Sequence, residues 1–199
     1  HGKCRVCHAR LCDCMENEFG NPSSLHMLGV KAQAVMDNAR KNIASALMTT
    51  PETIYFTSGA TESSNLAIKG VAGAYGRRKK RLVTTTVEHS SVKEIFDSLE
   101  KEGYEVIRIS PGSDGEFSVD DFTEAVDENT CLISVMLVNN ETGSILPVKK
   151  IFSMAKMKNS EIITHCDAVQ AFMKIPVKPA DLKADLISMS AHKIYGPKG

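Results

Sequence analysis

The sequence has no excess of charge of either sign. It contains 24 basic and 24 acidic side chains, so its formal net charge at pH 7 is zero. A dedicated nucleic-acid or anionic-membrane binder would carry a basic surplus, and we therefore expect neither nucleic acid nor a membrane among the partners. No apolar run approaches the ~20 residues that a transmembrane helix needs. The first residues, HGKCRVCHARLCDC, lack the apolar core of a signal peptide, which predicts a cytoplasmic protein.

Internal repeats and low-complexity segments are also missing. The 199 residues are 42% hydrophobic and 24% charged, which is ordinary for a soluble globular protein and excludes long disorder, collagen and coiled coil. At about 100–200 residues per domain, we expect one domain, accompanied at most by an incomplete neighbour.

Cysteine is unevenly distributed. Four of the six cysteines lie in the first fourteen residues, whereas Cys131 and Cys166 stand alone in apolar runs. A chain of this length does not need a disulfide framework, because that device belongs to small secreted scaffolds. We therefore predict that Cys131 and Cys166 are buried thiols within strands.

Residues 1–18 form an atypical, cysteine-rich start. The run from Cys4 to His8 formally matches a c-type haem attachment site, and Cys12 with Cys14 could complete a zinc site. Haem attachment needs an export signal that we do not find, and the spacing is cramped for zinc. We assign no metal site, and a chimeric or mistranslated start is the alternative interpretation.

From residue 23 onward, helix-like and strand-like stretches alternate. Strands separated by helical stretches of ten or more residues form right-handed crossovers and a mainly parallel sheet. The strands are continuously apolar, which indicates that helices cover both faces. The predicted fold class is α/β, with three layers and a mainly parallel sheet covered by helices. Strands are predicted at 54–57, 82–87, 104–109, 131–138, 161–165 and 185–189, and helices at 31–47, 62–75, 91–101, 118–126 and 148–158.

Polar side chains follow these strands. In a parallel α/β sheet, ligands bind beyond the carboxyl ends of the strands. The small-residue turn 58–62 opens a helix whose N–H groups suit a phosphate. The segments after the strands together offer a hydroxyl, an imidazole, an amide, a carboxylate and an amine. They come from Thr61, His89, one of the adjacent Asn139 and Asn140, Asp167 with Gln170, and Ser190 to Lys193. Such convergence is more informative than any single residue.

The basic run Arg77–Arg81 lies between a predicted helix and a predicted strand. Contact with a phosphate backbone is one interpretation, but no aromatic residues interleave with the basic ones. We favour a solvated connection, because charge runs in a neutral protein are more often exposed loops.

The groups that follow the strands meet the requirements of pyridoxal phosphate. This cofactor needs a lysine for a Schiff base, a carboxylate opposite its pyridine nitrogen and a cup for its phosphate. A carboxylate at Asp167 would keep the nitrogen protonated, so that the ring can accept carbanion electrons. Lys193 is the candidate lysine.

From Phe19 to Gly199 the chain also closely resembles the NifS/IscS-type cysteine desulfurases of the class V aminotransferase family. The matching stretches are, in order, FGNPSSLH (19–26), FTSGATESSNLAIKG (56–70), EHSSV (88–92), VNNETG (138–143), DAVQ (167–170) and SAHKIYGPKG (190–199). The resemblance implies that residues 19–199 are the large, cofactor-binding domain of a PLP-dependent transferase of fold type I. That domain is incomplete, and the small C-terminal domain of the family is absent.

The resemblance assigns roles to the matching positions. Lys193 matches the Schiff-base lysine, and His89 matches the histidine that stacks on the ring and moves protons, so these two are the expected catalytic residues. Asp167 matches the partner of the pyridine nitrogen, and Gln170 that of the phenolic oxygen. Asn140 matches an asparagine that holds the substrate carboxylate and orients the cofactor. The phosphate ligands match Ala60, Thr61, Ser190 and His192.

The implied activity converts L-cysteine to L-alanine and transfers the sulfur to an enzyme cysteine, as a persulfide for iron–sulfur cluster assembly or thiolation. The resemblance implies a homodimer that passes sulfur to iron–sulfur scaffolds or other acceptor proteins. Two alternatives stay open: a selenocysteine lyase or other class V enzyme, and an inactive truncated fragment whose cysteine-rich start binds metal. The 199-residue chain alone is expected to be inactive, because none of its six cysteines matches the sulfur-accepting one.

Overall fold

The computed structural model describes residues 5–76 and 78–196, so Cys4, Arg77 and the motif residues 197–199 lie outside the described chain. The chain divides into two compact units, of which the larger is Thr57–Ser190. The smaller comprises His1–Phe56 and Ala191–Gly199. Within the described ranges, no helix is long and apolar enough to cross a membrane.

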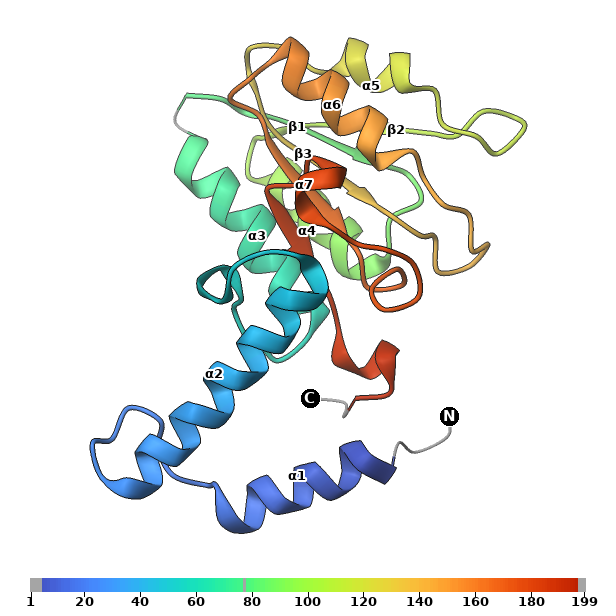
Figure 1. Ribbon diagram of the computed structural model, residues 1–199. Helices are drawn as coiled ribbons and strands as arrows, with labels where there is room; N and C mark the ends of the chain where they lie inside the picture. The colour runs from blue at the N-terminus through green and yellow to red at the C-terminus, as the bar shows by residue number, and fades with distance from the viewer. Residues whose placement is uncertain (1–4, 77, 197–199) are drawn as a thin grey trace. The chain divides into compact units, whose positions relative to one another are not determined.

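The larger unit is built on a five-stranded sheet in which every neighbouring pair is parallel. Its strand order is β2-β1-β3-β4-β5. Figure 1 shows this sheet, with β1, β2 and β3 labelled. The central strands β1, β3 and β4 are buried along nearly their whole length, while the edge strands β2 and β5 are more exposed. The position of the central strands between other strands and under helices explains this burial. The strands are β1 (Arg81–Thr85), β2 (Glu105–Ile109), β3 (Thr130–Met136), β4 (Ile163–Asp167) and β5 (Leu186–Ser188).

Helices cover both faces of this sheet. The helix α3 contacts α4, β3, β4 and β5, whereas α6 contacts α5, α7 and β3. Connections from β1 and from β3 run in opposite directions across the sheet, and right-handed crossovers therefore place α4 and α6 on opposite faces (Figure 1). This three-layer α/β arrangement confirms the predicted fold class. The helices are α3 (Ala60–Tyr75), α4 (Ser90–Lys101), α5 (Val119–Ala125), α6 (Val148–Lys158) and α7 (Pro179–Leu182).

The core lies between the sheet and its helices. In α4, Val92, Ile95, Phe96 and Leu99 recur at helical spacing, and all four are buried. Each such side chain stabilises the fold by roughly 1.5–3 kcal/mol relative to an exposed position. The prediction of two buried thiols is confirmed, since Cys131 and Cys166 are fully buried. Burial raises the pKa of the Cys131 thiol to about 11, so this thiol stays protonated and unreactive at pH 7.

The predicted strand at 54–57 is wrong. A short 3-10 helix, η1 (Pro51–Thr53), occupies the preceding residues, and the segment after it pairs with no strand of the sheet. The carbonyl of Ile54 accepts a hydrogen bond from Arg40 Nε at 3.4 Å, and the Tyr55 side chain is 78% exposed. The residues are β-prone, but strand formation depends on a neighbouring strand and a buried face, which this segment lacks.

The other five predicted strands are confirmed, and the largest shift falls on the fourth. The strand β4 covers Ile163–Asp167 instead of 161–165. It starts later because the Ile162 N–H closes a turn onto the Asn159 carbonyl. The strand β4 ends later because its pairing with β3 continues as far as Asp167, which lies opposite Met136. Asp167 is consequently the last residue of a buried strand, with a backbone held on both sides.

The smaller unit contains α1 (Arg5–Asn17), α2 (Met27–Leu47), η1 and the 3-10 helix η2 (Ala191–Ile194). No residue of α1 is buried. Cys12 Sγ lies 3.9 Å from His8 Nδ1. Over the described ranges, no three or more His, Cys, Asp or Glu side chains group closely enough to hold a metal ion. In α2, His26 serves as the N-cap and accepts a hydrogen bond from the Gly29 N–H through Nδ1.

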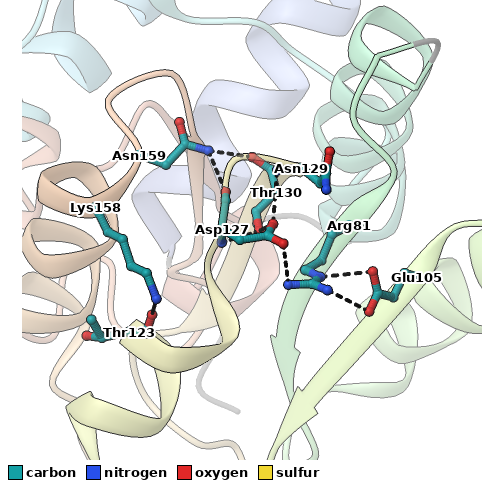
Figure 2. Close-up of polar contacts among 8 residues, drawn as sticks. All are labelled: Arg81, Glu105, Thr123, Asp127, Asn129, Thr130, Lys158 and Asn159. Carbon is teal, nitrogen blue, oxygen red and sulfur yellow. Dashed lines mark hydrogen bonds and ion pairs between the residues drawn. The ribbon is translucent and has the colours of Figure 1, made fainter.

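Charged side chains tie the strands together at the amino edge of the sheet (Figure 2). Arg81 donates two hydrogen bonds of 2.9 Å to the carboxylate of Glu105 and one of 2.6 Å to Asp127. Lys79, from the same basic run, pairs with Glu161 at 2.6 Å. The run therefore contributes two side chains to ion pairs that fasten strands and loops, while its residues 78 and 80 are exposed.

Asn159 completes this edge and provides a stability test. Its Nδ2 donates to the carbonyls of Asp127 and Thr130, both at 2.9 Å, and the residue is buried (Figure 2). Asn159→Ala leaves these acceptors without their donor, and we expect it to lower the free energy of unfolding by about 2–3 kcal/mol. Lys158→Ala is the matched control, because Lys158 makes one exposed hydrogen bond to Thr123 and its loss should cost below about 1 kcal/mol. Urea denaturation of the full-length protein measures both; equal losses would contradict the prediction.

Candidate active site

Asp167 is the buried acid at the carboxyl edge of the sheet. It is 5% exposed, and its Oδ1 accepts a hydrogen bond of 2.9 Å from the Val169 N–H. Burial raises the pKa of this carboxyl group, while the Val169 N–H and the charge of His89 act in the opposite direction. Asp167 is therefore a buried carboxylate, oriented by a hydrogen bond, that is suited to pair with a cation.

His89 begins the helix that follows β1. Its Nδ1 accepts a hydrogen bond from the Ser91 N–H at 3.1 Å and lies 2.8 Å from Ser91 Oγ, so His89 is the N-cap of α4. Because Nδ1 accepts an N–H, the neutral ring carries its hydrogen on Nε2. The residue is exposed, and the charge of its protonated form lowers the pKa of Asp167. The capping contact thus fixes the ring and leaves Nε2 as the nitrogen able to give up a proton.

The start of α3 offers N–H groups at the same edge. The N-cap residue Gly59 has no side chain to accept hydrogen bonds, so the first-turn amides, including those of Ala60 and Thr61, have no acceptor within the helix. Ser63 Oγ donates to Ser188 Oγ at 3.0 Å, which fastens this turn to the end of β5. Ser190 follows two residues later and is buried. These groups suit an anion such as a phosphate.

Two adjacent asparagines follow β3 and differ in role. Asn139 is buried, and its Oδ1 accepts hydrogen bonds of 2.9 Å from the N–H groups of Glu141 and Thr142. Its Nδ2 donates to the carbonyl of Val87, across to the turn after β1. Asn139 therefore shapes the loop, and the exposed Asn140 is the residue that the loop presents.

Gln170 lies in the turn that follows β4. Its Oε1 accepts a hydrogen bond of 2.9 Å from Lys174 Nζ, which leaves the amide NH₂ as the donor for another group.

The predicted site residues fall in both units of the chain. The larger unit carries seven of them at or just beyond the carboxyl edge of one sheet: Ala60, Thr61, His89, Asn140, Asp167, Gln170 and Ser190. His192 and Lys193 belong to the smaller unit, where both are exposed residues of η2.

The structure adds Glu88 and His165 to the groups near this edge. His165 is fully buried, with Nδ1 at 2.8 Å from Ser134 Oγ and Nε2 at 2.9 Å from Ser188 Oγ. Burial lowers the pKa of His165 to about 4, so it is a neutral link across β3, β4 and β5. Glu88 is not among the site residues predicted from the sequence. Its place directly after the predicted buried strand 82–87 is the feature that could have indicated it.

Known proteins have sequences and structures similar to those of this chain. The chain is 45% identical over 189 residues to the cysteine desulfurase IscS of Aeromonas hydrophila, a match that covers 94% of this chain and 46% of that protein. A solved structure of a NifS-like protein superposes with a TM-score of 0.95 at 38% identity, covering 98% of this chain and 53% of the other. A structure described as SspA in complex with cysteine superposes with a TM-score of 0.93 at 37% identity. The match covers 98% of this chain and 56% of the other.

The chain thus spans about half the length of the relatives it matches. The family model for aminotransferase class-V matches residues 3–199. The fold, the relatives and this family match agree, and the chain belongs to the aminotransferase class-V family.

Proposed function

We propose that the protein carrying this chain is a pyridoxal-phosphate-dependent cysteine desulfurase. The observation that carries the proposal is the buried, hydrogen-bonded Asp167 at the carboxyl edge, beside His89 and near the uncapped start of α3. The relatives named as cysteine desulfurases, and the relative in complex with cysteine, support this substrate class.

The residues of the larger unit fit this cofactor. Its cationic pyridine nitrogen calls for a desolvated carboxylate, which Asp167 supplies, and its phosphate calls for N–H and hydroxyl donors, which the start of α3 supplies. When bound, pyridoxal phosphate withdraws electrons from the substrate carbon that carries the amino group. Asp167 would hold the proton on the ring nitrogen, and Gln170 would donate to the phenolic oxygen.

The remaining residues would bind substrate and move protons. His89, capped through Nδ1, would stack on the ring and transfer a proton through Nε2. Lys193 would attach the cofactor covalently and then accept or return the proton at the substrate carbon. Asn140 would hold the substrate carboxylate, and His192 with Ser190 would complete the phosphate ligands.

The overall change is the conversion of L-cysteine to L-alanine. A cysteine thiolate of the protein would attack the substrate sulfur, so that an S–S bond forms and the C–S bond breaks. The electron pair of that bond stays on carbon, which takes up a proton, and the sulfur remains as a persulfide. The homodimer, the cytoplasmic location and the iron–sulfur or thiolation partners remain predictions.

The test uses the full-length protein loaded with pyridoxal phosphate. We expect alanine from L-cysteine in amounts equal to the sulfide released in the presence of a thiol reductant. L-Serine is the control, because its C–O bond has no sulfur to transfer. Failure to form alanine would contradict the proposal, and activity toward L-selenocysteine alone would make the protein a selenocysteine lyase.

A further inference from the structure

Glu88 lies where the two halves of the sheet diverge. The pairing of β1 with β3 ends at Val83 opposite Ile133, whereas β3 continues beside β4 to Met136 opposite Asp167. The chain connections also run in opposite directions from this point, and ligands of parallel sheets bind at such a reversal of strand order. Glu88 is therefore at the part of the carboxyl edge where a ligand is expected.

The side chain of Glu88 bridges the diverging strands. Its Oε1 accepts hydrogen bonds from Thr85 Oγ1 at 2.8 Å and from the Met136 N–H at 2.9 Å. The pairing of β3 with β1 has already ended before Met136. Glu88 therefore supplies the acceptor for the Met136 N–H on that side of β3. The turn that carries His89 is thus connected to the residue that pairs with Asp167.

The other oxygen of Glu88 has a different environment. Among the described residues, Oε2 is buried and has no hydrogen-bond partner. The titratable groups that act on or respond to Glu88 are Asp167 and Cys166 on β4, and His89 is its neighbour in the chain. The pKa of Glu88 is raised to about 8, mainly by burial and further by the negative charge of Asp167. The hydrogen bonds from Met136 and Thr85 act in the opposite direction.

We propose that Glu88 is a positioning residue that works as an uncharged carboxylic acid, joining the His89 turn to the strand end at Asp167 without placing a second negative charge there. A charged Glu88 would raise the pKa of Asp167, because like charges disfavour ionisation. An uncharged Glu88 adds no second negative charge, so it does not further disfavour the ionised form of Asp167 that a pyridinium requires as its counter-charge. The proposal rests on the proposed function, since the roles of His89 and Asp167 come from it.

Two substitutions separate an uncharged acid from a carboxylate. Glu88→Gln keeps the size of the side chain and the accepting Oε1, but cannot ionise. Glu88→Met keeps much of the volume and removes the acceptor, which leaves the donors of Thr85 and Met136 unpaired. In the full-length protein we expect E88Q to keep the pyridoxal phosphate affinity and the kcat of the wild type, and E88M to lose about tenfold or more in both.

Readouts independent of activity measure the charge itself. Infrared spectra of the wild type at pH 7 should contain the C=O band of a buried protonated carboxylic acid, which is missing from E88Q. The raised pKa means that the folded state holds this proton more tightly than the unfolded state. The contribution of this proton to the free energy of unfolding is therefore complete below the ordinary pKa of glutamate. It is lost as the pH rises to about 8, the pKa of Glu88 in the folded protein. The unfolding midpoint of E88Q should fall less over this range than that of the wild type.

The outcomes decide the proposal separately from the proposed function. An E88Q protein as impaired as E88M, or a wild type without the infrared band at pH 7, would overturn the role given to Glu88. A wild type that binds pyridoxal phosphate but forms no alanine from cysteine would overturn the proposed function. In that case the infrared band and the cofactor affinities of the two variants still decide the state and role of Glu88.

Discussion

Replacement of Lys193 by alanine in the full-length protein is expected to abolish covalent attachment of pyridoxal phosphate. No other amine is proposed to bond to the cofactor, and Lys193 would also move the proton at the substrate carbon. Loss of both roles should lower alanine formation by on the order of 10³-fold or more. The measurement is the cofactor absorbance, followed by borohydride reduction and mass spectrometry of the peptide that contains residue 193.

Lys150→Ala is the matched control for this change. Lys150 is an exposed lysine on α6, and its loss should leave the reducible adduct and the turnover unchanged. Persistence of the colour and of a borohydride-stable adduct in the Lys193→Ala protein would show that a different amine binds the cofactor.

Replacement of Asp167 by asparagine has the second largest expected effect. The amide has the same shape, and its oxygen can still accept the hydrogen bond from the Val169 N–H, so the end of β4 should keep its structure. A neutral amide cannot hold the proton on the pyridine nitrogen, and we expect kcat to fall by on the order of 10²- to 10⁴-fold. Cofactor binding should change far less, because the phosphate donors at the start of α3 are untouched.

Asp185→Asn controls for the same chemical change elsewhere in the sheet. Asp185 accepts hydrogen bonds from the Thr164 backbone and from Lys156 at the opposite edge, so its substitution should affect stability and spare kcat. Spectra of the bound cofactor across pH, together with steady-state rates, distinguish the two variants. Near-normal alanine formation by Asp167→Asn would refute the role of this carboxylate.

The regular elements follow from patterns along the chain, with informative exceptions. Apolar and β-branched runs predict β1 and β3 because these strands are buried on both faces. The same kind of pattern fails at residues 54–57. There the Ile54 carbonyl accepts a hydrogen bond from Arg40, and none of the strands in the described part of the chain pairs with the segment. Strand formation needs a partner that local sequence does not identify. The end of β4 likewise depends on its register with β3, which carries the strand to Asp167.

The sequence by itself determined the chemistry available to this protein. The order of strands and helices places Thr61, His89, Asn140 and Asp167 at one edge, because parallel strands present their carboxyl ends together. The motifs around those residues identify the family, and both conclusions depend only on residue types and their spacing along the chain.

Only the tertiary structure decided which polar groups are buried and whether they carry charge. Residue type alone does not distinguish Asn139 from Asn140, and only the resemblance to a family selects Asn140. The structure gives the physical difference, because Asn139 makes hydrogen bonds within the loop while Asn140 is exposed. Nothing in the local sequence distinguishes Glu88 from a surface acid. In the structure one of its oxygens bridges β1 and β3, and the other is buried without a hydrogen-bond partner among the described residues. Desolvation and the charge of a residue 79 positions away set its protonation, and neither is a property of local sequence.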